Sequence, residues 1–285
     1  LNGGSGINTA DYSSSSAAVS VNLSTGSNGG GDAQGDVLSN IQNVTGASFA
    51  DTLTGDGNAN LLTGGAGNDS LLGGAGNDTL AGGSGADTLD GGTGTNTADY
   101  STSSAGVVVN LTVSTGQTST GDASGDVLAN IQNITGSAFA DTLTGDSNAN
   151  LLSGGAGNDV LSGGAGNDTL IGGVGADSID GGTGTNTVDY SASSAAVTVN
   201  LTVTTGQGGL GDAYGDVLIN IQNVVGSSYD DLLTGNSSAN ALTGGAGKDT
   251  LIGGAGADTL DGGSGTNTVD YSASSAGVTE IERAS

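Results

Sequence analysis

The chain has 285 residues, 58 of them glycine, and contains no proline, cysteine, histidine, methionine or tryptophan. Two basic residues stand against 29 acidic ones, and the resulting formal net charge of −27 excludes a surface that neutralises nucleic-acid phosphates and disfavours binding to an anionic membrane. No stretch approaches the roughly 20 apolar residues of a membrane-spanning helix, and a chain without cysteine has no disulfides.

The tyrosine of an Asp-Tyr-Ser sequence marks the start of a large repeat. It occurs at Tyr12, Tyr100, Tyr190 and Tyr271, with spacings of 88, 90 and 81 residues. The loss of nine residues from one copy is typical of a solenoid, in which each repeat contacts only its neighbours. We therefore divide the chain into the end of a preceding unit (1–11), unit one (12–99), unit two (100–189), the shorter unit three (190–270), and the start of a further unit with a divergent tail (271–285).

The first part of each unit is a segment of 36 residues in units two and three and 34 in unit one, called the 36-residue segment below, which in unit two spans 100–135. Val107, Val109, Leu111 and Val113 alternate along the chain, as in a half-buried strand. A loop rich in threonine, serine and glycine follows, and two short apolar runs come after it. We expect wider coils of the same solenoid with one protruding loop. Four acidic residues near this loop form either a weaker calcium site or a solvated acidic turn: Asp122, Asp126, Asp212 and Asp216.

The second part of each unit consists of nonapeptides, at 46–99, 136–189 and 226–270. The clearest run, 64–92, repeats Gly-Gly-x-Gly-x-Asp-x-U-x, where U is a large aliphatic residue. Aliphatic residues such as Leu71, Leu80 and Leu89 recur at every ninth position, which a flexible linker has no reason to maintain. The pattern predicts a short strand with one inward side chain after each glycine-rich turn.

The turn has the composition of a cation site. Glycines reach backbone angles that other residues resist, and they leave their carbonyl oxygens uncovered. Ca²⁺ takes six to eight oxygen ligands, from carboxylates and main-chain carbonyls. Two nonapeptides form one coil of 18 residues, so aspartates 18 residues apart lie about 4.8 Å from each other. Bare carboxylates at about 5 Å repel by roughly 3 kcal/mol, and a cation between them reverses the sign.

This coil length assigns the candidate ligands to the two edges of the solenoid. In unit one, Asp51, Asp69 and Asp87 share one edge, whereas Asn60, Asp78 and Asn96 share the other. The asparagines are weaker sites or hydrogen-bonded ends of turns. The candidate carboxylates are Asp51, Asp69, Asp78, Asp87, Asp141, Asp159, Asp168, Asp177, Asp231, Asp249 and Asp258. The candidate carbonyls are those of Gly65, Gly67, Gly74, Gly76, Gly155, Gly157, Gly164, Gly166, Gly245, Gly247, Gly254 and Gly256.

The nonapeptide resembles the repeat of the RTX, or hemolysin-type calcium-binding, family. The resemblance implies an all-β fold, a right-handed parallel β-roll or β-helix solenoid, with Ca²⁺ ions held between successive turns on one edge. It also implies that such chains leave a bacterium unfolded through type I secretion. Calcium outside the cell then closes the turns.

We therefore expect a secreted, calcium-binding structural protein that folds into a stiff acidic rod of about 75 Å. Such a rod suits an extracellular spacer, a surface layer or a filament, in which copies associate end to end through open coils. The alternative is the calcium-dependent folding and secretion segment of a larger enzyme, toxin or adhesin. We do not expect an enzyme, because no histidine or cysteine is present to activate a nucleophile.

Overall fold

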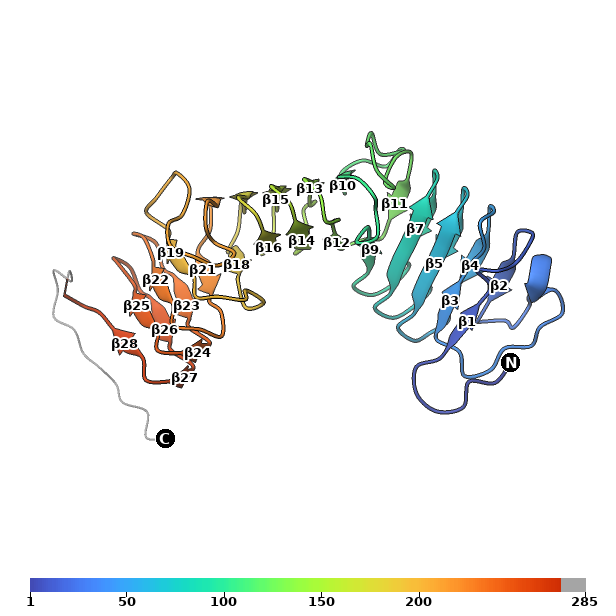
Figure 1. Ribbon diagram of the computed structural model, residues 1–285, viewed down its shortest axis with the longest axis horizontal. Helices are drawn as coiled ribbons and strands as arrows, with labels where there is room; N and C mark the ends of the chain where they lie inside the picture. Colours follow the sequence, from blue (N-terminus) through green and yellow to red (C-terminus); the bar gives the residue numbers. More distant parts are fainter. Residues whose placement is uncertain (273–285) are drawn as a thin grey trace.

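The computed structural model describes residues 1–272 and shows a solenoid of short parallel strands (Figure 1). Residues 273–285, which include most of the expected divergent tail, lie outside the described residues. Apart from one turn of 3-10 helix, η1 (Gly31–Ala33), the regular structure of the described chain is β-strand. The fold is thus the all-β parallel β-roll expected from the repeat.

One side of the solenoid is a continuous twelve-stranded sheet, whose neighbouring strands are all parallel. Its order is β1 (Thr9–Asp11), β3 (Asn43–Thr45), β5 (Leu61–Ala66), β7 (Thr79–Ser84), β9 (Thr97–Asp99), β12 (Asn133–Thr135), β14 (Leu151–Ala156), β16 (Thr169–Val174), β18 (Thr187–Asp189), β21 (Asn223–Val225), β23 (Ala241–Thr243) and β26 (Thr259–Asp261).

The other side is divided into three sheets. The first runs β11 (Val127–Ala129), β8 (Thr88–Asp90), β6 (Ser70–Leu72), β4 (Thr52–Thr54) and β2 (Ser20–Asn22). The second runs β10 (Val108–Asn110), β13 (Thr142–Thr144), β15 (Val160–Ser162), β17 (Ser178–Asp180) and β20 (Val217–Ile219). The third runs β19 (Thr198–Asn200), β22 (Leu232–Thr234), β25 (Thr250–Ile252) and β28 (Thr268–Val269). A small pair, β24 (Ala246–Gly247) and β27 (Ser264–Gly265), lies in two turns.

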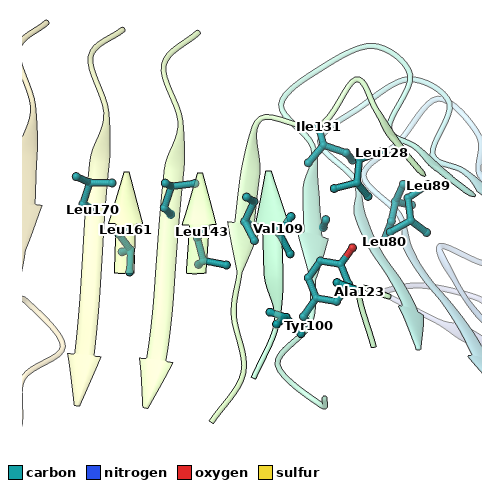
Figure 2. Packing of buried hydrophobic residues seen from close by; sticks show 14 of the residues in the cluster. Leu80, Leu89, Tyr100, Val109, Ala123, Leu128, Ile131, Leu143, Leu161 and Leu170 are labelled. Atoms are coloured by element: carbon teal, nitrogen blue, oxygen red, sulfur yellow. The ribbon is translucent and has the colours of Figure 1, made fainter. Parts of the chain in front are cut away.

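The aliphatic residue of each nonapeptide forms the core. In the strand triplet x-U-x the middle side chain points inward, and the register places Leu62 beside Leu80, 18 residues on. Leu53, Leu71 and Leu89 form the matching stack on the opposite sheet and are fully buried. Leu89 is in register with Leu128, and Figure 2 shows the buried core continuing past Leu128 and Tyr100 to Val109 and Leu143. The two stacks bury each other's apolar surface, which stabilises the coil.

The 36-residue segment differs from the expected wider coils. Strand β9 pairs directly with β12, so the segment adds only one strand to the twelve-stranded sheet. On the opposite side it adds two strands in reversed order, because β11 pairs with the earlier β8 while β10 pairs with the later β13. The sheet is therefore interrupted between β10 and β11.

A buried glutamine fills this interruption. The N–H of Asn110, in β10, donates to the side-chain oxygen of Gln117, and the N–H of Gln117 donates to the carbonyl of Asp126, just before β11. Gln207 makes the same contacts in unit three, with Asn200 and Asp216. These contacts satisfy main-chain groups that an interrupted sheet would leave unpaired.

The extra strands bend the solenoid into an arch (Figure 1). The twelve-stranded sheet lines the inner side, and the interrupted sheets, with β10, β11, β13 and β15, lie on the outer side. Each such segment lengthens the outer side by two strand spacings and the inner side by one, so the coils on its two sides are inclined to each other. The expected rod of about 75 Å is therefore curved, and its inner sheet of twelve strands about 4.8 Å apart is about 53 Å long.

The shorter unit three changes sides at its end. Strands β9 and β18 close units one and two in the twelve-stranded sheet, whereas their counterpart β28 pairs with β25 in the opposite sheet. Nine residues are half a coil, so losing one nonapeptide moves everything after it to the other side. No helix among residues 1–272 is long and apolar enough to cross a membrane.

Candidate metal sites in the turns

The aspartates of one edge form a hydrogen-bonded ladder. The N–H of Asp51 donates to the carboxylate of Asp69 at 2.7 Å, and the N–H of Asp69 donates to Asp87 at 2.7 Å. The ladder continues from Asp87 to Asp126 at 2.8 Å, across the start of the 36-residue segment. Asp141, Asp159, Asp177 and Asp216 repeat the same series in unit two.

The opposite edge alternates amides and carboxylates. Asn60 donates its N–H to Asp78 at 2.8 Å, and Asp78 donates its N–H to Asn96 at 3.0 Å. The next step is Gln132, whose side-chain oxygen accepts the N–H of Asn96 at 2.8 Å. Our sequence analysis missed this glutamine, although the recurring Asn-Ile-Gln-Asn of each unit is a visible signal for it.

Seven ladder carboxylates each keep one buried oxygen without a hydrogen-bond partner. The first oxygen, Oδ1, accepts an N–H from the neighbouring coil, whereas the second, Oδ2, is orphaned. These residues are Asp69, Asp78, Asp87, Asp159, Asp168, Asp177 and Asp249. All seven side chains are at most 3% exposed. A buried carboxylate without a partner is strongly unfavourable, so the site requires a proton or a cation at this oxygen.

Burial also raises pKa values within the ladders. Desolvation raises the pKa of Asp69 and Asp159 to about 6, and that of Asp87 and Asp177 to about 7, against hydrogen bonds from the main chain that lower it. The pKa values of Asp78 and Asp168 are raised for the same reason. Neighbouring ladder carboxylates add to the effect at Asp69 and Asp87. The negative charge is therefore poorly compensated by the protein alone.

Glycine is required where the orphaned oxygen lies. A β-carbon at Gly64 would collide with the Asp69 carboxylate and would lie 2.6 Å from the carbonyl oxygen of Gly82 in the next coil. The same pair of oxygens, a carboxylate and a carbonyl, flanks Gly73, Gly154 and Gly163. The turns thus gather oxygens from two successive coils, which is the donor set that Ca²⁺ prefers.

An asparagine turn shows what occupies the site when the carboxylate is absent. In the turn that ends at Asn267, the side-chain NH₂ donates to the carbonyls of Gly262 at 2.7 Å and Gly263 at 3.4 Å. In this turn the carbonyls of the first two glycines therefore face the sixth position, whereas the NH₂ groups of Asn96 and Asn186 donate to the carbonyls of Asn130 and Asn220. With aspartate at that position, an oxygen replaces the donor, so a cation or a proton is needed between the carboxylate and the carbonyls. The residues present fit Ca²⁺.

The twelve glycines predicted to offer carbonyls all lie in these turns with positive φ. Three of the second-position carbonyls, those of Gly74, Gly164 and Gly245, also accept an N–H from the next coil at 2.8–2.9 Å. The first glycine of each turn, represented by Gly262, was absent from our predicted carbonyls.

Five of the candidate carboxylates have protein donors on both oxygens. The Oδ2 atoms of Asp51, Asp141 and Asp231 accept an N–H from the second residue of their own turn, which is Ala47, Ser137 and Ser227 respectively. The Oδ2 atoms of Asp126 and Asp216 accept the hydroxyl protons of Tyr100 at 3.0 Å and Tyr190 at 2.8 Å.

The remaining candidates lie outside the buried ladders. Asp126 and Asp216 are fully buried, so a solvated acidic turn is wrong for these two residues. Their neighbours Asp122 and Asp212 are partly exposed, and their N–H groups donate to Ser103 and Ser193. Asp258 accepts the N–H of Asn240 at 3.0 Å and is also partly exposed.

No group of three or more histidine, cysteine, aspartate or glutamate side chains that could hold a metal occurs in residues 1–272. Each turn instead offers one aspartate and several main-chain carbonyls, so carbonyls would supply most of the ligands. Such a site suits a hard cation that accepts neutral oxygens, as Ca²⁺ does. It does not suit Zn²⁺, which takes nitrogen and sulfur ligands.

Comparison with known families agrees with this geometry. The model of the RTX calcium-binding nonapeptide repeat matches residues 45–80, 63–98, 131–161, 153–188, 222–251 and 234–269, which together make up more than half of the chain. The chain belongs to this family of calcium-binding repeat proteins. Its repeat is a structural calcium-binding element and not a catalytic one. No curated protein matches the chain.

Proposed function

We propose that this chain is a secreted structural segment that folds on binding several calcium ions and forms a curved, acidic spacer outside a bacterial cell. The observation that supports the proposal is the set of seven orphaned, buried carboxylate oxygens in a chain of net charge −27. Without cations the ladders repel and the buried charges are unsatisfied. With cations the same ladders hold successive coils together.

The calcium dependence gives a reason for secretion in an unfolded state. Extracellular calcium modules bind at roughly 10⁻⁴–10⁻³ M, far above cytosolic calcium. Binding free energy at such sites becomes folding free energy when the unfolded chain has no preformed site. The chain would therefore remain unfolded inside the cell and fold outside it. RTX repeats are typical of secreted bacterial proteins, which supports this location.

A structural role is favoured over catalysis. Two equivalent polar clefts lie beside the 36-residue segments, one lined by Asn40, Gln42 and Asp56 and the other by Asn130, Gln132 and Asp146. Their volumes are about 190 and 170 Å³, below the roughly 300 Å³ at which ligand pockets begin. End-to-end association of copies stays a prediction, based on β1 and β26 as the outer strands of the twelve-stranded sheet in the described chain.

The proposal is tested by far-UV circular dichroism of the chain after removal of calcium, followed by titration with CaCl₂. We expect a cooperative change from coil to β-structure near millimolar calcium, because the ligands of each ion come from two coils. MgCl₂ is the control and should not reproduce the change, since Mg²⁺ demands shorter, octahedral coordination. A full β spectrum in chelator would contradict calcium-dependent folding.

A further inference from the structure

The turns of this chain differ in the residues at their second and sixth positions. Each pair of residue types satisfies the hydrogen-bonding groups that point into the turn in a different way. Turns with glycine second and aspartate sixth contain the seven orphaned oxygens. Turns with alanine or serine second and aspartate sixth contain none, because the second N–H donates to the aspartate. Turns with aspartate or asparagine second and asparagine sixth also use the second N–H, as from Asp56 to Asn60 at 2.8 Å.

The physical cause is the orientation of one peptide group. The N–H of the second residue and the carbonyl of the first residue belong to the same peptide, so only one of them faces inward. Gly65, Gly155 and Gly245 have φ of +114°, +103° and +102°, a region that alanine and serine avoid. Ala47, Ser137 and Ser227 are not among the residues with positive φ, and they turn the N–H inward. At Gly262–Gly263 the flipped peptide turns the carbonyl inward instead.

We infer that the second residue of each turn decides whether the turn takes a calcium ion. Glycine there presents a carbonyl, so an aspartate at the sixth position completes a cation site. Any other residue presents an N–H, which donates to the side chain at the sixth position and satisfies its inward oxygen without metal. This inference rests on the proposed calcium binding and narrows it to eight turns, those of Asp69, Asp78, Asp87, Asp159, Asp168, Asp177, Asp249 and Asp258.

Three of the candidate ligands then have a role other than calcium binding. Asp51, Asp141 and Asp231 are the first aspartates of their blocks, and they accept the N–H groups of Val19, Val107 and Val197 from the 36-residue segments at 2.7 Å. At the far end of the first two blocks, Tyr100 and Tyr190 satisfy Asp126 and Asp216. Carboxylates that need no calcium therefore lie at both ends of each of these two blocks, and the metal sites lie between the two ends.

Two matched triple variants test the inference, because the chain offers both kinds of aspartate one coil apart on the same edge. One is D51N/D141N/D231N, and the other is D69N/D159N/D249N. Bound calcium per chain is measured by equilibrium dialysis, with circular dichroism in saturating calcium as the check on folding. We expect the first variant to bind as many ions as the unchanged chain, and the second to bind fewer by roughly one per substituted turn.

The second variant has an independent readout. In the described turns with glycine second and asparagine sixth, the asparagine NH₂ donates to main-chain carbonyls, those of Gly262 and Gly263 from Asn267 and those of Asn130 and Asn220 from Asn96 and Asn186. Each new asparagine therefore places a donor among the carbonyls that would otherwise hold the ion. D69N/D159N/D249N should therefore fold at a lower calcium concentration than the unchanged chain, although it binds fewer ions. An equal loss of calcium in both triple variants would overturn the inference. If the unchanged chain bound no calcium, the proposed function itself would be wrong.

A third variant tests the inference without changing an aspartate, in case the aspartate variants do not fold. A47G/S137G/S227G leaves every carboxylate in place and allows the second peptide of three turns to flip. We expect its calcium content to rise above that of the unchanged chain, because the three turns acquire the glycine-second, aspartate-sixth combination. An unchanged calcium content in this folded variant would show that the second residue does not decide metal binding.

Discussion

The ladder aspartates are buried with a charge that the protein does not fully compensate. Asp69 and Asp87 each accept one main-chain N–H and keep the other oxygen free of donors. Desolvation dominates at both residues and raises their pKa to about 6 and about 7. A proton and a calcium ion are therefore alternative ways to satisfy the same oxygen.

This competition predicts that acid partly replaces calcium. The folded-state pKa values of Asp69 and Asp87 lie above the ordinary value of 3.8, so the calcium-free folded state takes up protons that the unfolded chain does not. The stabilisation is present in acid and is lost as the pH rises through about 6 to 7. Calcium-free chain, desalted after chelation, should thus gain β-structure in circular dichroism between pH 8 and pH 5. A loss of β-structure over this range would contradict the prediction.

At the scale of the strand, the core depends on the single inward side chain of each triplet. Leu80 is fully buried, between Leu62 and Ala98 in register along the twelve-stranded sheet. Each coil contributes only a few such side chains, so neighbouring residues have little freedom to close a cavity. The contribution of one leucine is therefore large compared with that of an outward residue.

We predict that Leu80→Ala lowers the free energy of unfolding by about 2–5 kcal/mol in saturating calcium, through lost burial and the cavity left behind. Leu72→Ala is the matched control, because Leu72 lies in β6 with its side chain 40% exposed. It should cost well under half as much. Thermal melts followed by circular dichroism measure both variants, and equal shifts in Tm would show that the core assignment is wrong.

The strands of the nonapeptides were predictable from sequence, whereas the 36-residue segments were only partly so. In a nonapeptide the turn, the strand and the inward residue are all local, and the period of 18 sets the pairing. The pairing of β10 with β13 and of β11 with β8 reverses the order of the chain. No local pattern encodes that reversal, which depends on Gln117 bridging the gap.

For the turns, too, one feature was predictable from sequence and another was not. The position of each aspartate on its edge follows from counting residues. The direction of a single peptide does not, and it separates Asp51, held by its own turn, from Asp69, which is not. The tyrosine that satisfies Asp126 lies 26 residues earlier in the sequence, so its role also required the folded coil.

For the whole molecule, the bend depends on the 36-residue segments and not on the nonapeptides. Deleting residues 100–135 joins two nonapeptides in frame and removes one strand of the twelve-stranded sheet together with both extra outer strands, β10 and β11. Deleting residues 64–81 removes one strand from each side and leaves the bend. The two deletion variants therefore share the length of the inner sheet and differ in curvature.

We predict that the first deletion variant is the more extended of the two in saturating calcium. Small-angle X-ray scattering gives the maximum dimension of each, and the chain lacking 100–135 should have the larger value although it has lost more residues. An equal or smaller maximum dimension would mean that the arch has another cause. Circular dichroism confirms that both variants are folded before the comparison is made.

Because β28 lies in the sheet opposite to its counterparts β9 and β18, the number of nonapeptides in a unit determines on which side of the solenoid the unit ends. Units one and two carry six nonapeptides, an even number, so each following 36-residue segment enters on the same side. Unit three carries five, an odd number. In an array of such units, even counts make successive bends add into a ring-like curve, and odd counts make them alternate into a wave that advances in one direction. Whether a unit has an even or an odd number of nonapeptides, which one duplication or loss of nine residues changes, would then determine whether the array closes or extends.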